Sequence, residues 1–565
     1  MLAIVLVLLL LTAAWIWWNR PKKVDMAAYV PADSLVYLET NSLTEVASAL
    51  LETEAGRKLG PSIGIRSEAR RNSWLTSLAR VTGIGSAQSV IAARAQLALV
   101  ILDLNATADE TTLDFKPLAA LVVETHTSAT RIKPAVEQLI GDFAQRAYGR
   151  PAIERVTKDQ GEFVKWISPD GKRQIVVSID GTVAIVGNNE QAVSACLAVH
   201  RGQKPSLATQ PGLEEMRGRV RARDSMAFGY VSSANAARLL PELAPYLLLN
   251  RLPDIVKRCI ALSAPRMLGS IGWSAHALAG RIEDVYSISL MNNTLGRLQP
   301  GFKGDAPGQR EGAWEFLPAE TATVTNYNFA APSMVWAAMN KAISAEQLDV
   351  LCAIGFKEVS TKLLVPYGID DPESFLRAIK PVLLTAKLDA DSPRSVIITG
   401  VADEQVLRQF VARTFGKKLR TEQVDGSELL VSDDDQTGAG FVDGYFLLGS
   451  PEDLRRCLSG VAKRKASGPA AGWDKLIDHT ANGAGYVITH AQDRERLRGM
   501  VAAVMKFRGR DSSVNSGEEV ERVIKELPYA VTETKLTEYG FERKTRSPLG
   551  QFSTFVSLLS PEQAH

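Results

Sequence analysis

Several residue patterns that mark common protein classes are missing from this chain of 565 residues. Its four cysteines are too few for a disulfide-rich scaffold, and no Cys-x-x-Cys occurs. Its six histidines show none of the spacings that bring two imidazoles to one metal ion. A Walker A sequence and a Gly-x-Ser-x-Gly motif are also missing. These patterns predict no metal and no cofactor, and they favour a protein that is not an enzyme.

An excess of one charge is missing too. The 65 Lys and Arg residues nearly balance the 63 Asp and Glu residues, so the formal net charge is +2. A nucleic-acid-binding protein usually carries a clear basic excess, so we expect no nucleic-acid partner. Apolar residues make up 45% and charged residues 23% of the chain, which is ordinary for folded globular proteins.

One apolar run stands out, and it predicts a membrane anchor. Leu2 to Trp18 is uncharged over 17 residues and would span about 26 Å as a helix. Three tryptophans near its end suit the headgroup level of a bilayer. We therefore predict a transmembrane anchor over residues 1–19, a juxtamembrane linker over residues 20–28 and a single-pass membrane protein. A cleaved secretory signal is the alternative interpretation.

The side of the membrane on which the body lies is left open by the charges. Arg20, Lys22 and Lys23 follow the apolar run and no basic residue precedes it, which by the positive-inside rule would keep the body in the cytoplasm. A start codon assigned too late would have removed a basic leader. On that argument we favour an extracytoplasmic body.

Short motifs recur in the same order along the two parts of the body. Tyr29-Val-Pro-Ala-Asp-Ser34 is echoed by Phe316-Leu-Pro-Ala-Glu-Thr321. Asp180-Gly181 and Asp443-Gly444 each stand between apolar runs, where a type I′ hairpin turn is expected. Each hairpin is followed by a predicted helix that carries Cys-Leu. The order of these echoes predicts a tandem duplication.

A segment rich in glycine and proline, 298–312, predicts a linker between the two copies. Copy one is expected over 29–297 and copy two over 313–565. Because tight hairpins join neighbouring strands, each copy is expected to be a mainly antiparallel sheet with helices on one face. The predicted fold is therefore α+β, in two tandem homologous copies behind one N-terminal transmembrane helix.

The VPADSLVYLE sequence behind a single N-terminal anchor resembles a family of uncharacterised bacterial envelope proteins. The likeness covers the anchor and about the first 130 residues, with an echo at Phe316. The resemblance implies a cell-envelope location and no activity, cofactor or catalytic residue.

Two basic groups are candidate contacts for an anionic lipid or a cell-wall polymer, at about 1 kcal/mol per basic residue near an anionic surface. They are Arg217, Arg219, Arg221 and Arg223, and then Lys463, Arg464 and Lys465. On a strand the four alternating arginines would share one face, whereas on a helix they would spread over half of its circumference. The alternative interpretation is a solvated basic surface.

Other chemistry-bearing residues have simpler interpretations. Glu124 and His126 could form an acid–base pair, but a surface pair is favoured. Cys196 and Cys457 stand at equivalent positions and are expected to be small buried side chains. Asp433-Asp434-Asp435 could bind a hard cation, but a solvated hairpin loop is favoured.

These patterns together favour a membrane-anchored, non-enzymatic binding or scaffolding protein of the cell envelope. Its expected partners are the membrane, through Leu2 to Trp18, and a protein or lipid. Two alternatives stay open. One is an envelope hydrolase whose carboxylates come together from distant positions, because such pairs leave no linear signature. The other is a carrier of an apolar or lipid ligand.

Overall fold

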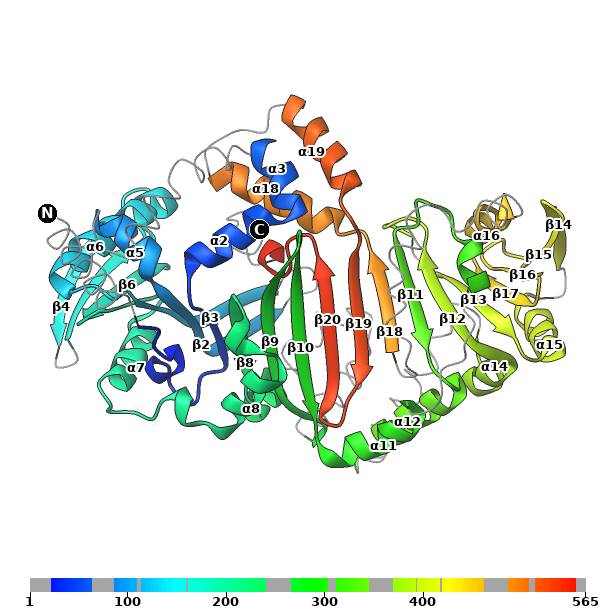
Figure 1. The fold of residues 1–565 in the computed structure, drawn as a ribbon, viewed down its shortest axis with the longest axis horizontal. Helices are drawn as coiled ribbons and strands as arrows, with labels where there is room; N and C mark the ends of the chain where they lie inside the picture. The colour runs from blue at the N-terminus through cyan, green and yellow to red at the C-terminus, as the bar shows by residue number, and fades with distance from the viewer. Residues whose placement is uncertain are drawn as a thin grey trace, which may run out of the picture.

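The computed structural model describes most of the body (Figure 1). The described residues are 22–62, 86–108, 113–158, 161–239, 266–302, 311–344, 369–392, 394–416, 419–461, 486–507 and 514–554. Its strands belong to one sheet of 20 strands, and every pairing in it is antiparallel.

The strands fall into two sets along the chain, which we call the first half and the second half. The first half contains β1 (Val36–Thr40), β2 (Gln96–Ala108), β3 (Leu113–Glu124), β4 (Ala152–Lys158), β5 (Gly161–Ile167), β6 (Gln174–Asp180), β7 (Val183–Gly187), β8 (Ala227–Val231), β9 (Leu268–Leu278) and β10 (Arg281–Leu290). The second half contains β11 (Thr323–Asn328), β12 (Ile379–Lys387), β13 (Val396–Val401), β14 (Arg420–Val424), β15 (Ser427–Val431), β16 (Gly438–Val442), β17 (Tyr445–Gly449), β18 (Tyr486–Ala491), β19 (Ala530–Leu536) and β20 (Gly540–Ser547).

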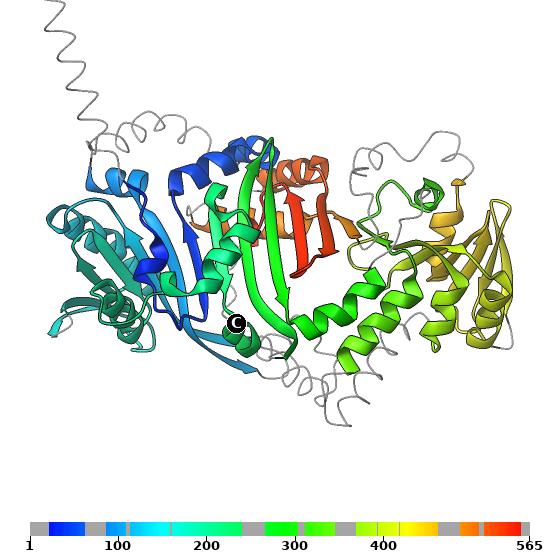
Figure 2. The same cartoon turned by 60° about the horizontal axis from the view of Figure 1, so that its bottom comes forward.

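The sheet runs without a break through both halves, from cyan to yellow in Figure 2. Its spatial order is β4-β5-β6-β7-β3-β2-β1-β8-β9-β10, followed by β20-β19-β18-β11-β12-β13-β17-β16-β15-β14. The prediction of two tandem copies, each with a sheet of its own, is therefore wrong. Strand pairing follows the same order on either side of the β10–β20 pair, which lets a position in one half be compared with its counterpart in the other.

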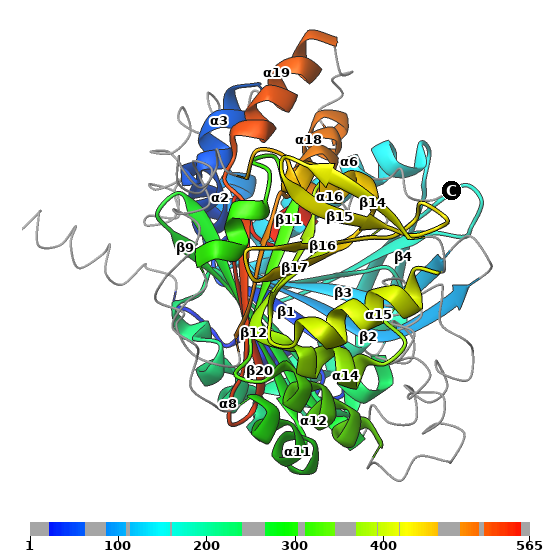
Figure 3. The ribbon, with the colours of Figure 1, turned by 90° about the vertical axis from the view of Figure 1, so that its right-hand side faces the viewer.

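Three contacts explain why the halves do not stand apart as separate units. β10 and β20 pair over eight residues of each strand, from Ile282–Ser547 to Ser289–Gly540. Helices α3 (Glu54–Ser62) of the first half and α18 (Arg494–Phe507) and α19 (Val514–Glu526) of the second share one apolar cluster. At the other end of the strands, α11 (Asn292–Phe302) packs on α12 (Pro332–Ser344) (Figure 3).

The approach of α11 to α12 depends on a small residue. A Cβ at Gly301 would lie 2.8 Å from the Ala338 Cβ and 2.9 Å from the Val335 Cα. Because α11 continues to Phe302, the first five residues of the predicted linker 298–312 are helical, and residues 303–310 of it lie outside the described part. The joint therefore begins as a packed helix and not as a loop.

Helices cover both faces of the sheet, so the prediction of helices on one face is wrong. In β6, Ile175 and Val177 pack with α6 (Ala129–Tyr148), while Val176 packs on the opposite side in the cluster that contains Cys196 of α7 (Glu190–His200). Neighbouring residues of a strand point to opposite faces. A strand with consecutive apolar residues is therefore buried on both sides.

The remaining helices complete these layers. In the first half they are η1 (Met26–Tyr29), α2 (Leu43–Glu52), α5 (Ala87–Arg94), η2 (Leu207–Thr209), α8 (Pro211–Arg219) and η3 (Ala222–Asp224). In the second half they are η4 (Glu311–Phe316), α14 (Pro372–Ala378), α15 (Glu404–Thr414) and α16 (Pro451–Leu458).

Both predicted Asp-Gly hairpins are present. In the β16–β17 turn, Asp443 has φ 50° and Gly444 has φ 79°, the pair of positive angles that a type I′ turn needs. In the β6–β7 turn only Gly181, with φ 61°, is positive. The first turn therefore differs from the type I′ geometry that its sequence predicts.

The predicted transmembrane helix, Leu2 to Trp18, lies outside the described residues. Among the residues that are described, no helix is long and apolar enough to cross a bilayer. The transmembrane part of the predicted fold therefore has no counterpart in the described structure.

Candidate functional site

The four arginines proposed as an anion-binding row do not share a face. Arg217 and Arg219 stand at the end of α8, Arg221 has a left-handed backbone with φ 56°, and Arg223 lies in η3. Each one contacts a carboxylate of the protein itself. The second basic group, Lys463 to Lys465, lies outside the described residues.

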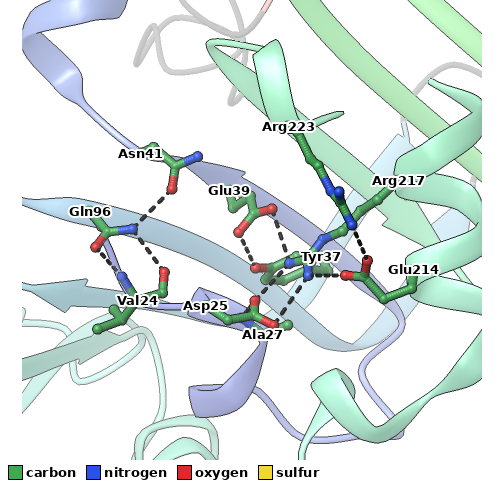
Figure 4. Close-up of polar contacts among 10 residues, drawn as sticks. All are labelled: Val24, Asp25, Ala27, Tyr37, Glu39, Asn41, Gln96, Glu214, Arg217 and Arg223. Atoms are coloured by element: carbon green, nitrogen blue, oxygen red, sulfur yellow. Dashed lines mark hydrogen bonds and ion pairs between the residues drawn. The ribbon is translucent and has the colours of Figure 1, made fainter. Parts of the chain in front are cut away.

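Arg217 is the centre of a partly buried ionic cluster (Figure 4). Its guanidinium donates to both carboxylate oxygens of Asp25, at 2.7 and 3.1 Å, to Glu39 at 3.2 Å and to Glu214 at 2.8 Å. The Tyr37 hydroxyl donates to the other oxygen of Glu39 at 2.6 Å. With four hydrogen bonds to three carboxylates, Arg217 has little capacity left for an external anion.

The titration behaviour of the cluster follows from its burial. Burial is the largest influence on Glu39 and raises its pKa, although Arg217 acts in the opposite direction. Burial also raises the pKa of Tyr37, and the neighbouring Glu39 charge adds to the rise. For Asp25 the hydrogen bonds and charge of Arg217 outweigh burial, so its pKa is lowered. Arg217 thus favours the ionised form of both Asp25 and Glu39.

The other arginines are also occupied. Arg219 donates to the Ser289 hydroxyl at 2.6 Å and lies 4.1 Å from the centre of the Tyr539 ring. Arg221 donates to Glu283 at 2.6 Å. Arg223 is 3.8 Å from Glu214 and its side chain is 89% exposed, the most exposed of the four.

Gln96 holds the segment that leads into the body, on the other side of Figure 4. Its side chain accepts from the Val24 amide at 2.9 Å and donates to the Val24 carbonyl at 3.0 Å and to Asn41 at 2.9 Å. The Nε2 atom of His126 lies 3.0 Å from the same Gln96 oxygen. Gln96 of β2 and Arg217 of α8 together hold Val24 and Asp25 against the first half.

Glu124 and His126 are drawn into this network and are not a surface pair. Glu124 is 3% exposed and accepts from the Thr182 hydroxyl at 2.9 Å and from the His126 amide at 2.8 Å. Burial, with the charge of Arg94, lowers the pKa of His126 despite the opposing Glu124 charge. These groups are satisfied by the protein, which favours a structural role for them.

The Asp433–Asp435 segment also keeps its carboxylates within the protein. Asp434 accepts from the Ser432 hydroxyl at 2.6 Å and Asp435 from Arg420 at 2.6 Å. Within the described ranges, no group of three or more His, Cys, Asp or Glu residues is placed to hold a metal ion.

A groove of about 380 Å³ opens on the first half, beside α7. Its apolar lining comes from Pro31, Leu102, Leu118, Ala195 and Ala198. Its charged lining comes from Asp33, Asp103, Lys204 and Arg238. Ligand pockets typically combine such an apolar wall with a few charged or polar groups, and they begin at about 300 Å³.

The second half carries a larger side chain at the position that matches Ala195. Val36 pairs with Ile101 and Thr323 with Lys387, so Asp103 and Asp389 each follow a matching strand position by two residues. Cys196 of α7 matches Cys457 of α16, so Ala195 matches Arg456.

The Arg456 guanidinium lies 2.6 Å from the Asp389 carboxylate. In the first half Ala195 stands at the position of Arg456, and Asp103 pairs instead with Arg238. The leucines beside these two aspartates differ in burial. Leu388 is 1% exposed, whereas its counterpart Leu102 is only partly buried. The groove of the first half thus has the small Ala195 in its lining, at the position that Arg456 takes in the second half.

The sequence carried a signal for this groove that single-motif searching misses. The two Cys-Leu helices differ just before the cysteine, with Ser194-Ala195 in α7 and Arg455-Arg456 in α16. The difference appears only when the two helices are aligned on their cysteines: α7 has small side chains where α16 has two arginines. The arginines at 217–223 and the basic residues at 463–465 could not be compared in this way with a matching segment.

Cys196 and Cys457 are both fully buried, as predicted. Burial raises the pKa of Cys196 to about 12, and the thiolate is the reactive form. In a chain with Cys259→Ser and Cys352→Ser, a thiol reagent such as DTNB should label neither remaining cysteine in the folded state. Two equivalents should react in denaturant. Rapid labelling of either thiol under native conditions would contradict this packing.

Comparison with protein-family models, with curated proteins and with solved structures finds no match to this chain. The chemistry of the site must therefore be argued from its own residues. Two features stand out: the ionic cluster, whose groups satisfy one another, and the groove, whose charged rim is open to solvent.

Proposed function

We propose that this chain is a non-enzymatic binding protein of the cell envelope, attached to the membrane by Leu2 to Trp18, and that it holds a small ligand in the groove beside α7. The membrane attachment rests on the sequence alone. The binding role is supported by one observation above the others: a groove lies beside Ala195, whereas Arg456, at the matching position of the second half, forms an ion pair with Asp389.

The size of the groove limits the kind of ligand. A volume of about 380 Å³ is near the lower end of the range for small-molecule sites, so a long polymer would not be enclosed. Four charged residues on its lining make it a poor container for a purely apolar molecule, because each charge would lose water on binding. The lipid-carrier alternative therefore has less support than a small amphipathic ligand.

The hydrolase alternative has one observation in its favour. Asp33 and Asp103 line the same groove, and a pair of acids is what such an enzyme would need. Asp103, however, forms an ion pair with Arg238, which occupies its carboxylate. We therefore expect ligands to be bound and not converted.

Filling the groove should remove binding without unfolding the protein. In Ala195→Arg the new arginine copies Arg456, whose counterpart site tolerates it. We expect this variant to lose the rise in Tm that groove ligands give the full-length chain in detergent, while its own Tm stays within a few degrees of wild type. The panel is a dipeptide, a free amino acid, a short-chain phosphatidylethanolamine and oleate.

The matched control is Ala195→Ser, which keeps the side chain small and should bind as wild type does. If every panel member acts equally on wild type and Ala195→Arg, the groove is not a binding site. Mass spectrometry of the same mixtures checks the alternative, since new products that depend on Asp33 would identify a hydrolase.

A further inference from the structure

Two opposite charges on the rim of the groove lack partners. Arg238 and Asp103 neutralise each other as an ion pair. Asp33 and Lys204 also line the groove, yet within the described part of the chain neither side chain forms an ion pair or hydrogen bond. The groove therefore presents one free carboxylate and one free ammonium group.

These two charges belong to neighbouring segments. Pro31 and Ser206 form an antiparallel bridge, and the Ala32 amide donates to the Pro205 carbonyl at 3.1 Å. Asp33 comes directly after Ala32, and Lys204 comes directly before Pro205. Both residues therefore lie next to this contact, on the same rim of the groove. The apolar surface of Leu102, Leu118 and Ala195 lies beside them.

We infer that the groove takes a short zwitterionic peptide with an apolar side chain, of about dipeptide size. The inference rests on the proposed function. In it the Asp33 carboxylate receives the peptide's terminal ammonium group and Lys204 its terminal carboxylate, while the apolar side chain covers Leu102. A zwitterion of this kind matches the two unpaired charges and leaves the net charge of the groove unchanged. Charge-assisted hydrogen bonds of this type are stronger than neutral ones.

Other ligands of similar size match the rim less well. A fatty acid has no ammonium group for Asp33, and a free sugar has no charge for either residue. A phosphatidylethanolamine headgroup is also a zwitterion, but its two acyl chains exceed the enclosed volume. The peptide is therefore the occupant that the charges and the volume favour.

Calorimetric titration of the full-length chain in detergent tests the inference, with the dipeptide Leu-Ala as the probe. N-acetyl-Leu-Ala lacks the ammonium group and Leu-Ala-amide lacks the carboxylate. We expect each blocked peptide to bind at least tenfold more weakly than Leu-Ala. Asp33→Asn should abolish the penalty for acetylation alone, and Lys204→Gln the penalty for amidation alone. Glu320→Gln, at the counterpart of Asp33 in the second half, should change none of these affinities.

The outcomes separate the inference from the function on which it rests. If the blocked peptides bind as well as Leu-Ala, and Ala195→Arg removes that binding, the groove binds ligands but the zwitterion assignment is wrong. If only short-chain phosphatidylethanolamine binds in a manner sensitive to Ala195→Arg, the peptide assignment is wrong. If no probe shows binding that Ala195→Arg removes, both the inference and the proposed function fail.

Discussion

Replacing Arg217 with methionine should lower the free energy of unfolding by about 2 kcal/mol, less than the cost of breaking a fully buried ion pair, because Asp25 and Glu214 are 41% and 56% exposed. The Arg217 side chain is 13% exposed and Glu39 is 10% exposed. Without the guanidinium, Glu39 would keep the Tyr37 hydroxyl as its hydrogen-bond donor, and Asp25 would lose both charged contacts. Denaturant unfolding of the full-length chain in detergent measures the loss.

The loss should grow as the pH rises. The pKa of Glu39 is already raised by burial against the opposing effect of Arg217, so the variant should raise it further. A buried acid with a raised pKa stabilises the fold at low pH and costs stability as the pH rises through that pKa. Asp25 has a lowered pKa in the wild type, which contributes stability at higher pH that the variant also loses. The gap between the two proteins should thus be larger at pH 8 than at pH 4.

A neighbouring arginine provides the control. Arg223→Met removes an 89% exposed side chain that lies 3.8 Å from Glu214, so its effect should stay below about 1 kcal/mol. In the double variant Arg217→Met with Glu39→Gln, part of the lost stability should return, because the carboxylate left without its charged partner is gone. Equal effects of Arg217→Met and Arg223→Met would show that the Arg217 cluster contributes no more to stability than an exposed ion pair.

Local features of this fold could be predicted because they depend on neighbouring residues. The Ser42 hydroxyl accepts from the Glu45 amide at 3.2 Å, as the Ser-x-x-Glu sequence indicates for a helix start. The Asp443-Gly444 hairpin and the buried cysteines likewise follow from short motifs. The antiparallel α+β character followed from the hairpins.

The continuous sheet could not be predicted, because its central contact is non-local. Strand β20 reads GFERKTRS, a polar sequence typical of an exposed segment, yet it pairs with β10 more than 250 positions earlier in the chain. Register between such segments is set by tertiary packing and leaves no local pattern. The ionic cluster could not be predicted for the same reason, since Arg217 is 192 residues from Asp25 and 178 from Glu39.

The pairing of β10 and β20 surrounds an acid whose ionisation should weaken the fold. Asp284 of β10 is fully buried and accepts from the Trp273 indole at 2.9 Å and from the Gln551 amide at 3.1 Å. The turn at Gly550, with φ 60°, presses against it, since a Cβ there would lie 2.9 Å from an Asp284 oxygen. Burial raises the pKa of Asp284 from 3.8 to about 6, although both hydrogen bonds act to lower it.

The sign of the pH dependence follows from that rise. The folded protein holds the Asp284 proton more tightly than the unfolded chain, so this group stabilises the fold fully below pH 3.8 and loses its contribution as the pH rises to about 6. The two pKa values correspond to about 3 kcal/mol. Asp284→Asn does not titrate, so the stability of wild type relative to this variant should fall by about that amount between pH 3.5 and 7.

The comparison is made between pH profiles because the asparagine also changes a hydrogen bond. Its amide group has one acceptor oxygen, so either Trp273 or Gln551 loses its acceptor at every pH. That loss shifts the unfolding free energy of Asp284→Asn by the same amount at every pH. The difference in slope between the two pH profiles therefore reports the ionisation of Asp284. Trp273→Phe removes a hydrogen bond that lowers the pKa of Asp284, so the fall in stability should extend to higher pH in this variant. Parallel profiles for wild type and Asp284→Asn would show that the carboxyl group keeps its ordinary titration in the folded protein, and that the contact between β10 and β20 carries no ionisation cost.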